Sequence, residues 1–149
     1  MPCDLQLNPM KTEIKASCIQ FCPVFGDTVG NLNAIIELTE KADSDLAVFP
    51  ELITSGYEFR DRSECMALAL NILGGREITE LTELASDTNT HLVIGFPERD
   101  KDQVFNSSIV IVPGGEAFIY RKIHLFDREK NLFVPGDKPV VVVETELGR

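Results

Sequence analysis

The alternation of apolar and polar residues along the chain predicts six strands. Residues 13–21 (EIKASCIQF) alternate roughly between the two classes, as in a strand. Residues 46–49 (LAVF) and 91–96 (HLVIGF) are short continuous apolar runs, typical of strands buried on both faces. Two later strands flank Pro113-Gly114-Gly115, which predicts a hairpin. The expected strands are residues 13–21, 46–49, 91–96, 103–112, 116–122 and 139–144.

Three further segments have the pattern of helices. Residues 28–42 and 77–89 each carry an apolar stripe near helical spacing. Residues 62–73 are apolar and rich in helix formers, and a Gly-Gly pair ends them. The remaining long segments, expected to be loops, are residues 50–61 and 123–138.

The order of these elements predicts a single α/β domain. Early strand–helix–strand units imply right-handed crossovers between parallel strands, with helices packed on the sheet. The later hairpin adds antiparallel strands, so the sheet should be mixed. We expect one domain over residues 1–149, in which residues 1–12 form a tail.

The last residues predict that the sheet continues past the chain. Residues 139–148 (PVVVVETELG) are an apolar strand that runs into a tight turn, and such a turn predicts a returning strand. Only Arg149 follows. A strand left at 139–144 would expose an apolar edge, which proteins normally avoid. We therefore expect the chain to be truncated, the N-terminal portion of a larger domain.

The charge of the chain narrows the classes of partner. Its formal net charge is −10, from 14 basic and 24 acidic residues. Nucleic acids and anionic membrane surfaces both attract Lys and Arg, so neither partner is expected. No apolar run is long enough to span a bilayer, and residues 1–11 lack the basic region and apolar core of a secretory signal. A cytoplasmic location is therefore expected.

The cysteines and histidines do not form a metal or redox motif. The two histidines lack the spacing of metal ligands, so no metal is expected. A thiol switch between Cys18 and Cys22 is disfavoured, because residues four apart on a strand are separated by roughly twice 6–7 Å. Buried free cysteines usually behave as small hydrophobes, so none is expected to be a nucleophile. The cysteines, which include no CxxC pair, are Cys3, Cys18, Cys22 and Cys65.

Polar residues follow three predicted strands, and ligands bind beyond the carboxyl ends of strands in doubly wound sheets. Glu51 comes directly after LAVFP, and a second strand runs into Pro97-Glu98. Lys122 ends EAFIYRK, and His124 follows two residues later. Taken singly, each has an ordinary interpretation as a solvated or singly hydrogen-bonded side chain. Their common place at strand ends makes Glu51 and Lys122 candidates for a site.

Taken together, five segments resemble the carbon–nitrogen hydrolase superfamily, also called the nitrilase superfamily. They follow one another in the order and spacing of that family, and the resemblance covers nearly the whole chain from Ile14 onward. Each segment is a weak signal alone, and the agreement of all five carries the resemblance. The segments are LAVFPELITSGY (46–57), VIGFPERD (93–100), VFNSSIVIVPGG (104–115), YRKIHLFDREKNLFVPGD (120–137) and ETELG (144–148).

The resemblance implies a fold and a reaction. The fold would be a four-layer α-β-β-α sandwich, of which this chain forms part, usually assembled as a dimer or larger oligomer. The reaction would be hydrolysis or condensation at a non-peptide carbon–nitrogen bond of a small molecule. That bond would belong to an amide, a carbamoyl group or a nitrile, and no cofactor would be needed. The stretch YRKIHLFDRE is more similar to the amidase and carbamoylase branches than to true nitrilases.

The resemblance also assigns roles within a Glu–Lys–Cys triad. Glu51 matches the general base, Lys122 the lysine that stabilises the oxyanion, and Glu129 a second carboxylate that orients the site. These roles fit the chemistry, since a thiol needs a base to become a thiolate and an ammonium stabilises developing negative charge. The family's cysteine lies beyond the position of Arg149, so it is absent from this chain and the chain alone should be inactive.

Two interpretations stay open beside this assignment. Tyr57 and Arg60 could line the substrate pocket, with Arg60 holding a carboxylate, although a packed loop with a solvated arginine is the simpler interpretation. The whole chain could also be a non-catalytic or split fragment. It would then act as an assembly module that pairs through an open final strand.

Overall fold

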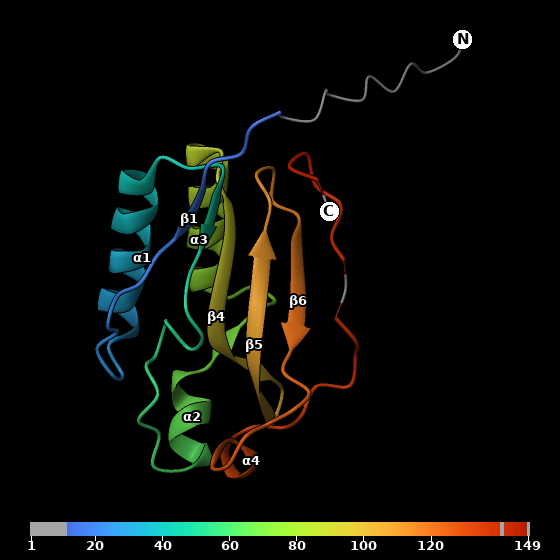
Figure 1. Cartoon of the computed structure of the whole chain (residues 1–149). Coiled ribbons are helices and arrows are strands. Elements are labelled where there is room, and N and C mark those ends of the chain that lie inside the picture. The colour runs from blue at the N-terminus through green and yellow to red at the C-terminus, as the bar shows by residue number, and fades with distance from the viewer. Residues whose placement is uncertain (1–11, 141, 149) are drawn as a thin grey trace.

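The computed structural model describes residues 12–140 and 142–148, which form one mixed sheet with helices (Figure 1). Most of the predicted residues 1–12 tail lies outside the described residues. The elements in chain order are β1 Ala16–Cys18, α1 Thr28–Ala42, β2 Leu46–Val48, α2 Arg62–Leu68, β3 Leu70–Asn71, α3 Arg76–Thr88, β4 His91–Asp100, β5 Gln103–Ile111, β6 Ala117–Arg121 and α4 Glu129–Leu132.

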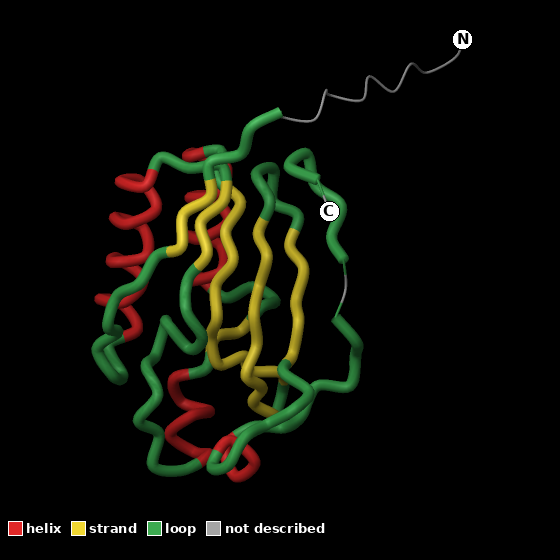
Figure 2. The backbone as a smooth tube through the Cα atoms, viewed as in Figure 1, coloured by secondary structure: helices red, strands yellow, loops and turns green. Residues whose placement is uncertain are grey.

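The sheet combines a parallel half and an antiparallel half, as the sequence predicts. Its strand order is β1-β2-β4-β5-β6, with β3 paired to the far end of β4. β1, β2 and β4 run parallel, and β4, β5 and β6 run antiparallel as successive hairpins (Figure 2). The predicted mixed α/β sheet is therefore confirmed.

Helices α1 and α3 cover one face of this sheet. Their apolar stripes meet alternate residues of the strands, because successive side chains of a strand point to opposite faces. On β4, for example, Leu92, Ile94 and Phe96 are fully buried in this core, whereas Val93 on the other face is only half-buried. The core of the described chain thus lies on one side of the sheet.

A smaller apolar cluster lies where α2 and α4 pack at the lower end of the strands in Figure 1. Phe59 is at its centre, and the rings of Phe25 and Phe133 pack edge to face against it. Their ring centroids lie 5.5 and 6.1 Å from the centroid of Phe59. This cluster anchors the two loops that carry the candidate site residues. Its buried members are Leu52, Phe59, Cys65, Val104, Leu132 and Phe133.

Local capping explains why α1 has the predicted bounds. The carboxylate of Asp27 accepts a hydrogen bond from the Gly30 N–H at 2.9 Å, which is an N-cap. At the other end Asp43 adopts a left-handed conformation, with φ of 44°, and stops the helix.

The predicted helix over residues 62–73 is wrong in its second half. Helix α2 ends at Leu68 because Ala69 is extended, and Leu70–Asn71 then pair in parallel with Glu98 and Arg99 as strand β3. The same pairing explains why β4 continues to Asp100, past the predicted end at Phe96. Pro97 falls between the parts of β4 that pair with β2 and β3, where a missing N–H is tolerated.

The end of the chain also differs from prediction. Residues 139, 140 and 142–144 form no strand, since no ladder partner holds them among the residues that the structure describes. Among the described residues at this end there is therefore no open apolar strand edge of the kind that the sequence predicts. The turn at 145–148 is confirmed by a bridge between Thr145 and Gly148. The loop at 123–138 contains the short helix α4.

Among the described helices none is both long and apolar enough to cross a membrane.

Candidate functional site

A tight turn after β2 presents Glu51 above the middle of β4. Leu52, the next residue, has a left-handed φ of 48°, and the Ile53 N–H donates to the Gly95 carbonyl at 2.9 Å. Gly95 permits this approach, because a Cβ at that position would lie only 2.5 Å from the Glu51 Cα. The turn therefore needs glycine on β4 to hold the Glu51 backbone against the sheet.

Lys122 extends the line of β6 by one residue. Its N–H donates to the Asn106 carbonyl on β5 at 2.8 Å, and its carbonyl accepts from the Gly136 N–H at 3.0 Å. The backbone of Lys122 is thus fixed on both sides. Its side chain leaves the sheet on the face opposite α1 and α3, the same face that Glu51 approaches.

Four side chains meet there in a closed arrangement, the Glu51–Lys122 cluster. The Lys122 Nζ lies 2.8 Å from the Glu51 Oε1 and 2.9 Å from the Glu129 Oε1. The Asn106 Nδ2 donates to the same two oxygens, at 2.6 and 2.8 Å. Two donors and two acceptors therefore alternate around one ring.

The two carboxylates of this cluster are not equivalent. The second oxygen of Glu129 accepts the Phe126 N–H at 2.7 Å, and the side chain is 19% exposed. Glu51 is 43% exposed, and its Oε2 accepts no hydrogen bond from the described residues. Glu129 is thus held at both oxygens, whereas Glu51 keeps one oxygen for another partner.

Hydrogen bonding outweighs burial in setting the protonation of this cluster. Burial is the largest single effect on the pKa of Lys122 and opposes its charge, but bonds to Glu51 and Glu129 raise that pKa overall. Burial likewise acts to raise the pKa of Glu129, and bonds from the Phe126 backbone, Lys122 and Asn106 lower it below its ordinary value. Near neutrality Lys122 is charged and Glu129 ionised.

An open cavity of about 430 Å³ adjoins the cluster. Its walls combine the polar groups of the Glu51–Lys122 cluster with apolar side chains and the Ser108 hydroxyl, while the Ser107 side chain turns to the opposite face and bonds Glu98. This combination suits a small polar ligand. The lining residues are Phe49, Glu51, Gly95, Asn106, Ser107, Ser108, Tyr120 and Lys122.

Tyr57 and Arg60, the two predicted substrate contacts, lie in different settings. The Tyr57 hydroxyl donates to the Glu51 backbone carbonyl, and burial together with the Glu51 charge raises the pKa of Tyr57, which keeps it protonated. Arg60 is exposed and bound to Glu64, with its Nη2 2.8 Å from the Glu64 Oε1. Tyr57 therefore borders the cluster, and Arg60 is engaged at the start of α2.

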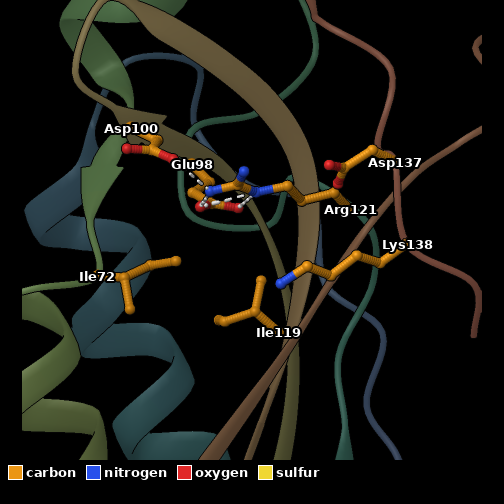
Figure 3. A pocket seen from close by; sticks show the side chains of 7 residues that line it. All are labelled: Ile72, Glu98, Asp100, Ile119, Arg121, Asp137 and Lys138. Carbon is orange, nitrogen blue, oxygen red and sulfur yellow. Dashed lines mark hydrogen bonds and ion pairs between the residues drawn. The ribbon is translucent and has the colours of Figure 1, made fainter. Parts of the chain in front are cut away.

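A second charged cluster lies on the other face of the same strands (Figure 3). Glu98 is 1% exposed and receives both Nε and Nη2 of Arg121 and, at 2.6 Å, the Ser107 hydroxyl. Arg121 also reaches Asp100 at 2.9 Å and lies 3.9 Å from the Phe105 ring centroid. Glu98, the second strand-end candidate, therefore does not join Glu51 and Lys122.

Asn106 was missed by the sequence analysis, although the hairpin signal contains it. The turn at Pro113 to Gly115 fixes the register in which Ile111 faces Ala117 and Ser107 faces Arg121. One step further along the same register, Asn106 falls opposite Lys122. Counting back from the turn would have placed an amide beside the lysine.

The described cysteines and histidines contribute no further site. Cys65 is buried beside Leu52, and desolvation raises the pKa of its thiol to about 12. Cys18 and Cys22 are exposed free thiols, and His124 is exposed. Within the part of the chain that is described, no three His, Cys, Asp or Glu side chains are grouped to hold a metal ion.

The sequence is similar to known proteins over most of its length. The family described as carbon-nitrogen hydrolase matches residues 15–149. A nitrilase of Pyrococcus abyssi is 43% identical over 103 residues, 69% of this chain and 39% of that protein. An (R)-stereoselective amidase of a Pseudomonas species is 32% identical over 132 residues, 87% of this chain and 47% of the amidase. The chain spans about half the length of such curated relatives.

The fold matches as well. A crystal structure of a Saccharomyces cerevisiae member of the nitrilase superfamily superposes with a TM-score of 0.78 and 26% identity, over 91% of this chain and 52% of the yeast protein. An amidase structure from a Nesterenkonia species gives a TM-score of 0.71 at 24% identity, over 90% of this chain and 52% of the amidase. This sequence and this fold show that the chain belongs to the carbon–nitrogen hydrolase family.

Proposed function

We propose that the chain supplies the general base and the oxyanion-stabilising lysine of a Glu–Lys–Cys hydrolase. The substrate would be a small molecule with a non-peptide carbon–nitrogen bond, an amide, a carbamoyl group or a nitrile. The cysteine would come from residues outside these 149. The observation that carries the proposal is the ion pair of Glu51 and Lys122 beside a cavity, with one oxygen of Glu51 left for a proton.

Glu51 acts as the base through its Oε2. That oxygen removes the proton of the incoming thiol, and the thiolate sulfur attacks the substrate carbon. When the carbon–nitrogen bond of an amide breaks, Glu51 returns the proton to the departing nitrogen. A water molecule then attacks the thioester carbon and gives a proton to Glu51. The carbon–sulfur bond breaks, and Glu51 returns the proton to the departing sulfur.

Lys122 stabilises the negative charge that develops on the substrate oxygen or nitrile nitrogen. An ammonium group has three N–H donors, and the contacts to Glu51 and Glu129 use two of them. The third is available to the anion, and the fixed backbone of Lys122 keeps it in place before the reaction begins. The raised pKa of Lys122 supports this role because the side chain stays charged.

Glu129 and the loop residues hold these groups in position. Glu129 is bonded at both oxygens, so it orients Lys122 rather than exchanging protons. Tyr57 donates to the Glu51 backbone carbonyl, so it is the better placed of the two candidate substrate contacts. Arg60 would have to leave Glu64 before it held a substrate carboxylate.

The test compares two polypeptides, the 149-residue chain and the reading frame continued past the codon of Arg149. Ammonia release is measured with a panel of amides, carbamoyl compounds and nitriles. We expect turnover by the longer polypeptide alone, reduced about 10³-fold or more by Glu51→Gln. Turnover by the 149-residue chain that Glu51→Gln abolishes would overturn the proposal, and so would a continued frame without a cysteine.

A second candidate function is a non-catalytic or split fragment that acts as an assembly module. The observation that favours it is the sheet face opposite α1 and α3, where Val93, Val110, Phe118 and Tyr120 are only half-buried. Pairing over this face, in a homo-oligomer or with another chain, would cover them. Light scattering of the 149-residue chain tests it, and a monomer at micromolar concentration would count against it.

A further inference from the structure

Asn106 has contacts that an ordinary strand residue does not need. It is 4% exposed, and its amide nitrogen donates to Glu51 at 2.6 Å and to Glu129 at 2.8 Å. Its backbone carbonyl accepts the Lys122 N–H at 2.8 Å. One residue of β5 therefore contacts each of the three charged groups of the Glu51–Lys122 cluster.

The charges of the cluster explain why a neutral donor is needed. Two carboxylates converge on one point, and Lys122 balances only one of their two negative charges. A second cation would remove the remaining negative charge, which a base requires. An amide donates two hydrogen bonds without adding charge, so it stabilises both ionised carboxylates and leaves the net charge of the group at −1.

The geometry also assigns the free oxygen of Glu51. Asn106 and Lys122 both bond to Oε1 of Glu51, and these two bonds fix the carboxylate plane from two directions. Oε2 is then turned away from the ring. Without Asn106, the carboxylate could rotate about its bond to Lys122, and either oxygen could meet the thiol.

We propose that Asn106 is a positioning residue that holds the Glu51 and Glu129 side chains in place and turns the Oε2 of Glu51 toward the reacting thiol. The inference rests on the proposed function for its catalytic consequence. Its electrostatic part, the effect of the Asn106 donor on the Glu129 carboxylate, concerns the 149-residue chain as it stands and is tested separately.

The first experiment measures side-chain titration in the 149-residue chain, with ¹³C-labelled glutamate and NMR. Asn106→Leu replaces the amide with an apolar side chain of similar size, and we expect the pKa of Glu129 to rise because it loses a donor. Ser107→Ala is the matched control, since it removes a buried hydrogen bond of the neighbouring residue on the opposite face. It should lower the unfolding midpoint without changing the Glu129 titration.

The second experiment uses the longer, active polypeptide. Asn106→Leu should lower kcat roughly 10- to 100-fold with little change in KM, because a misplaced base slows the reaction without weakening binding. The acid limb of the kcat/KM profile should move to higher pH. Ser107→Ala should leave that limb unchanged.

Asn106→Asp keeps the inference testable if the leucine variant does not fold. The new carboxyl group has the shape of the amide but donates only when it carries a proton. Because a carboxyl group donates at most one hydrogen bond where the amide donates two, the pKa of Glu129 should rise and kcat near neutral pH should fall, as in the leucine variant. Folded variants with unchanged titration and an unchanged acid limb would overturn the inference. If the longer polypeptide is inactive but the titration shifts, the proposed function fails and the electrostatic role of Asn106 stands.

Discussion

Arg121 and Lys122 are neighbours at the end of β6, and they point to opposite faces of one sheet. Arg121 meets Glu98, which is 1% exposed, and Lys122 meets Glu51, which is 43% exposed. Both basic groups bridge two carboxylates, since Arg121 also binds Asp100 and Lys122 also binds Glu129. The chemistry of the two clusters is therefore alike, and their surroundings differ.

The two clusters differ in how many hydrogen bonds the central carboxylate, Glu98 or Glu51, can still accept. Around Glu98, the Arg121 fork seen in Figure 3 and the Ser107 hydroxyl occupy both carboxylate oxygens. The ring of Phe105 covers the guanidinium. Both clusters border a cavity, of about 280 Å³ at Glu98 and about 430 Å³ at Glu51, but Glu51 keeps one carboxylate oxygen unused where Glu98 keeps none. A carboxylate that is buried and bonded at both oxygens stabilises the fold, and an accessible carboxylate with one unused oxygen can act on a ligand.

The largest expected effect on stability is from Glu98→Gln. It should lower the free energy of unfolding by about 2 kcal/mol, since a partly buried guanidinium loses its charged partner and keeps only Asp100. Urea denaturation of the 149-residue chain measures the loss. Asp100→Asn is the matched control, because that carboxylate is 45% exposed and should cost only about 0.5 kcal/mol. Equal losses in the two variants would remove the distinction between buried and exposed partners.

Lys122→Met should reduce stability only slightly and turnover strongly. Its ion pairs are partly exposed, so the loss of stability should be about 1 kcal/mol or less. In the longer polypeptide, turnover should fall about 10³-fold, because the developing anion loses its ammonium partner. Denaturation and ammonia release of the same preparation give both values. A stability loss as large as that of Glu98→Gln would mean that both clusters are mainly structural.

The smallest expected effect is the pH dependence of the Glu51–Lys122 cluster. The folded pKa of Glu129 lies below its ordinary 4.5, so its stabilising effect is complete above that pH and is lost as pH falls through the folded value. The folded pKa of Lys122 lies above 10.5, so its effect is complete below that pH and is lost as pH rises through the folded value.

Glu129→Gln isolates this dependence. The difference in unfolding free energy between this variant and the native chain should be greatest between pH 4.5 and 10.5 and should shrink on either side. Denaturation series at fixed ionic strength measure it. A difference that stays constant down to strongly acid pH would show that the carboxylate has no charge-dependent role.

The sequence predicts most of the fold because most elements depend on local signals. Helix α1 has the predicted bounds, since Asp27 caps its start and Asp43 ends it. Strand β3 has only two residues and exists because it pairs with Glu98 and Arg99, so no local pattern contains it. The final predicted strand fails for the same reason, because an apolar run becomes a strand only where a partner is present.

The site likewise combines residues that local sequence patterns reveal with features that depend on tertiary contacts. Strand ends mark Glu51 and Lys122, and the resemblance adds Glu129. Their convergence depends on the left-handed turn at Leu52 and on Gly95, which local patterns do not reveal. Asn106 was missed because a polar residue inside a strand resembles a solvent-facing one until the register is counted.

The hairpin turn from Pro113 to Gly115 lies at the upper end of β5 and β6 in Figure 1, at the opposite end of these strands from Lys122. Its length nevertheless decides which face each basic residue meets. One residue added or removed there would shift the β5–β6 register by one and exchange the two faces. A shift in one direction would place Arg121 opposite Asn106, on the cavity face, and a shift in the other direction would place Lys122 opposite Ser107, on the face of the buried carboxylate. The length of a remote turn thus determines which side chains reach the site. Single substitutions within the cavity would not reveal this dependence.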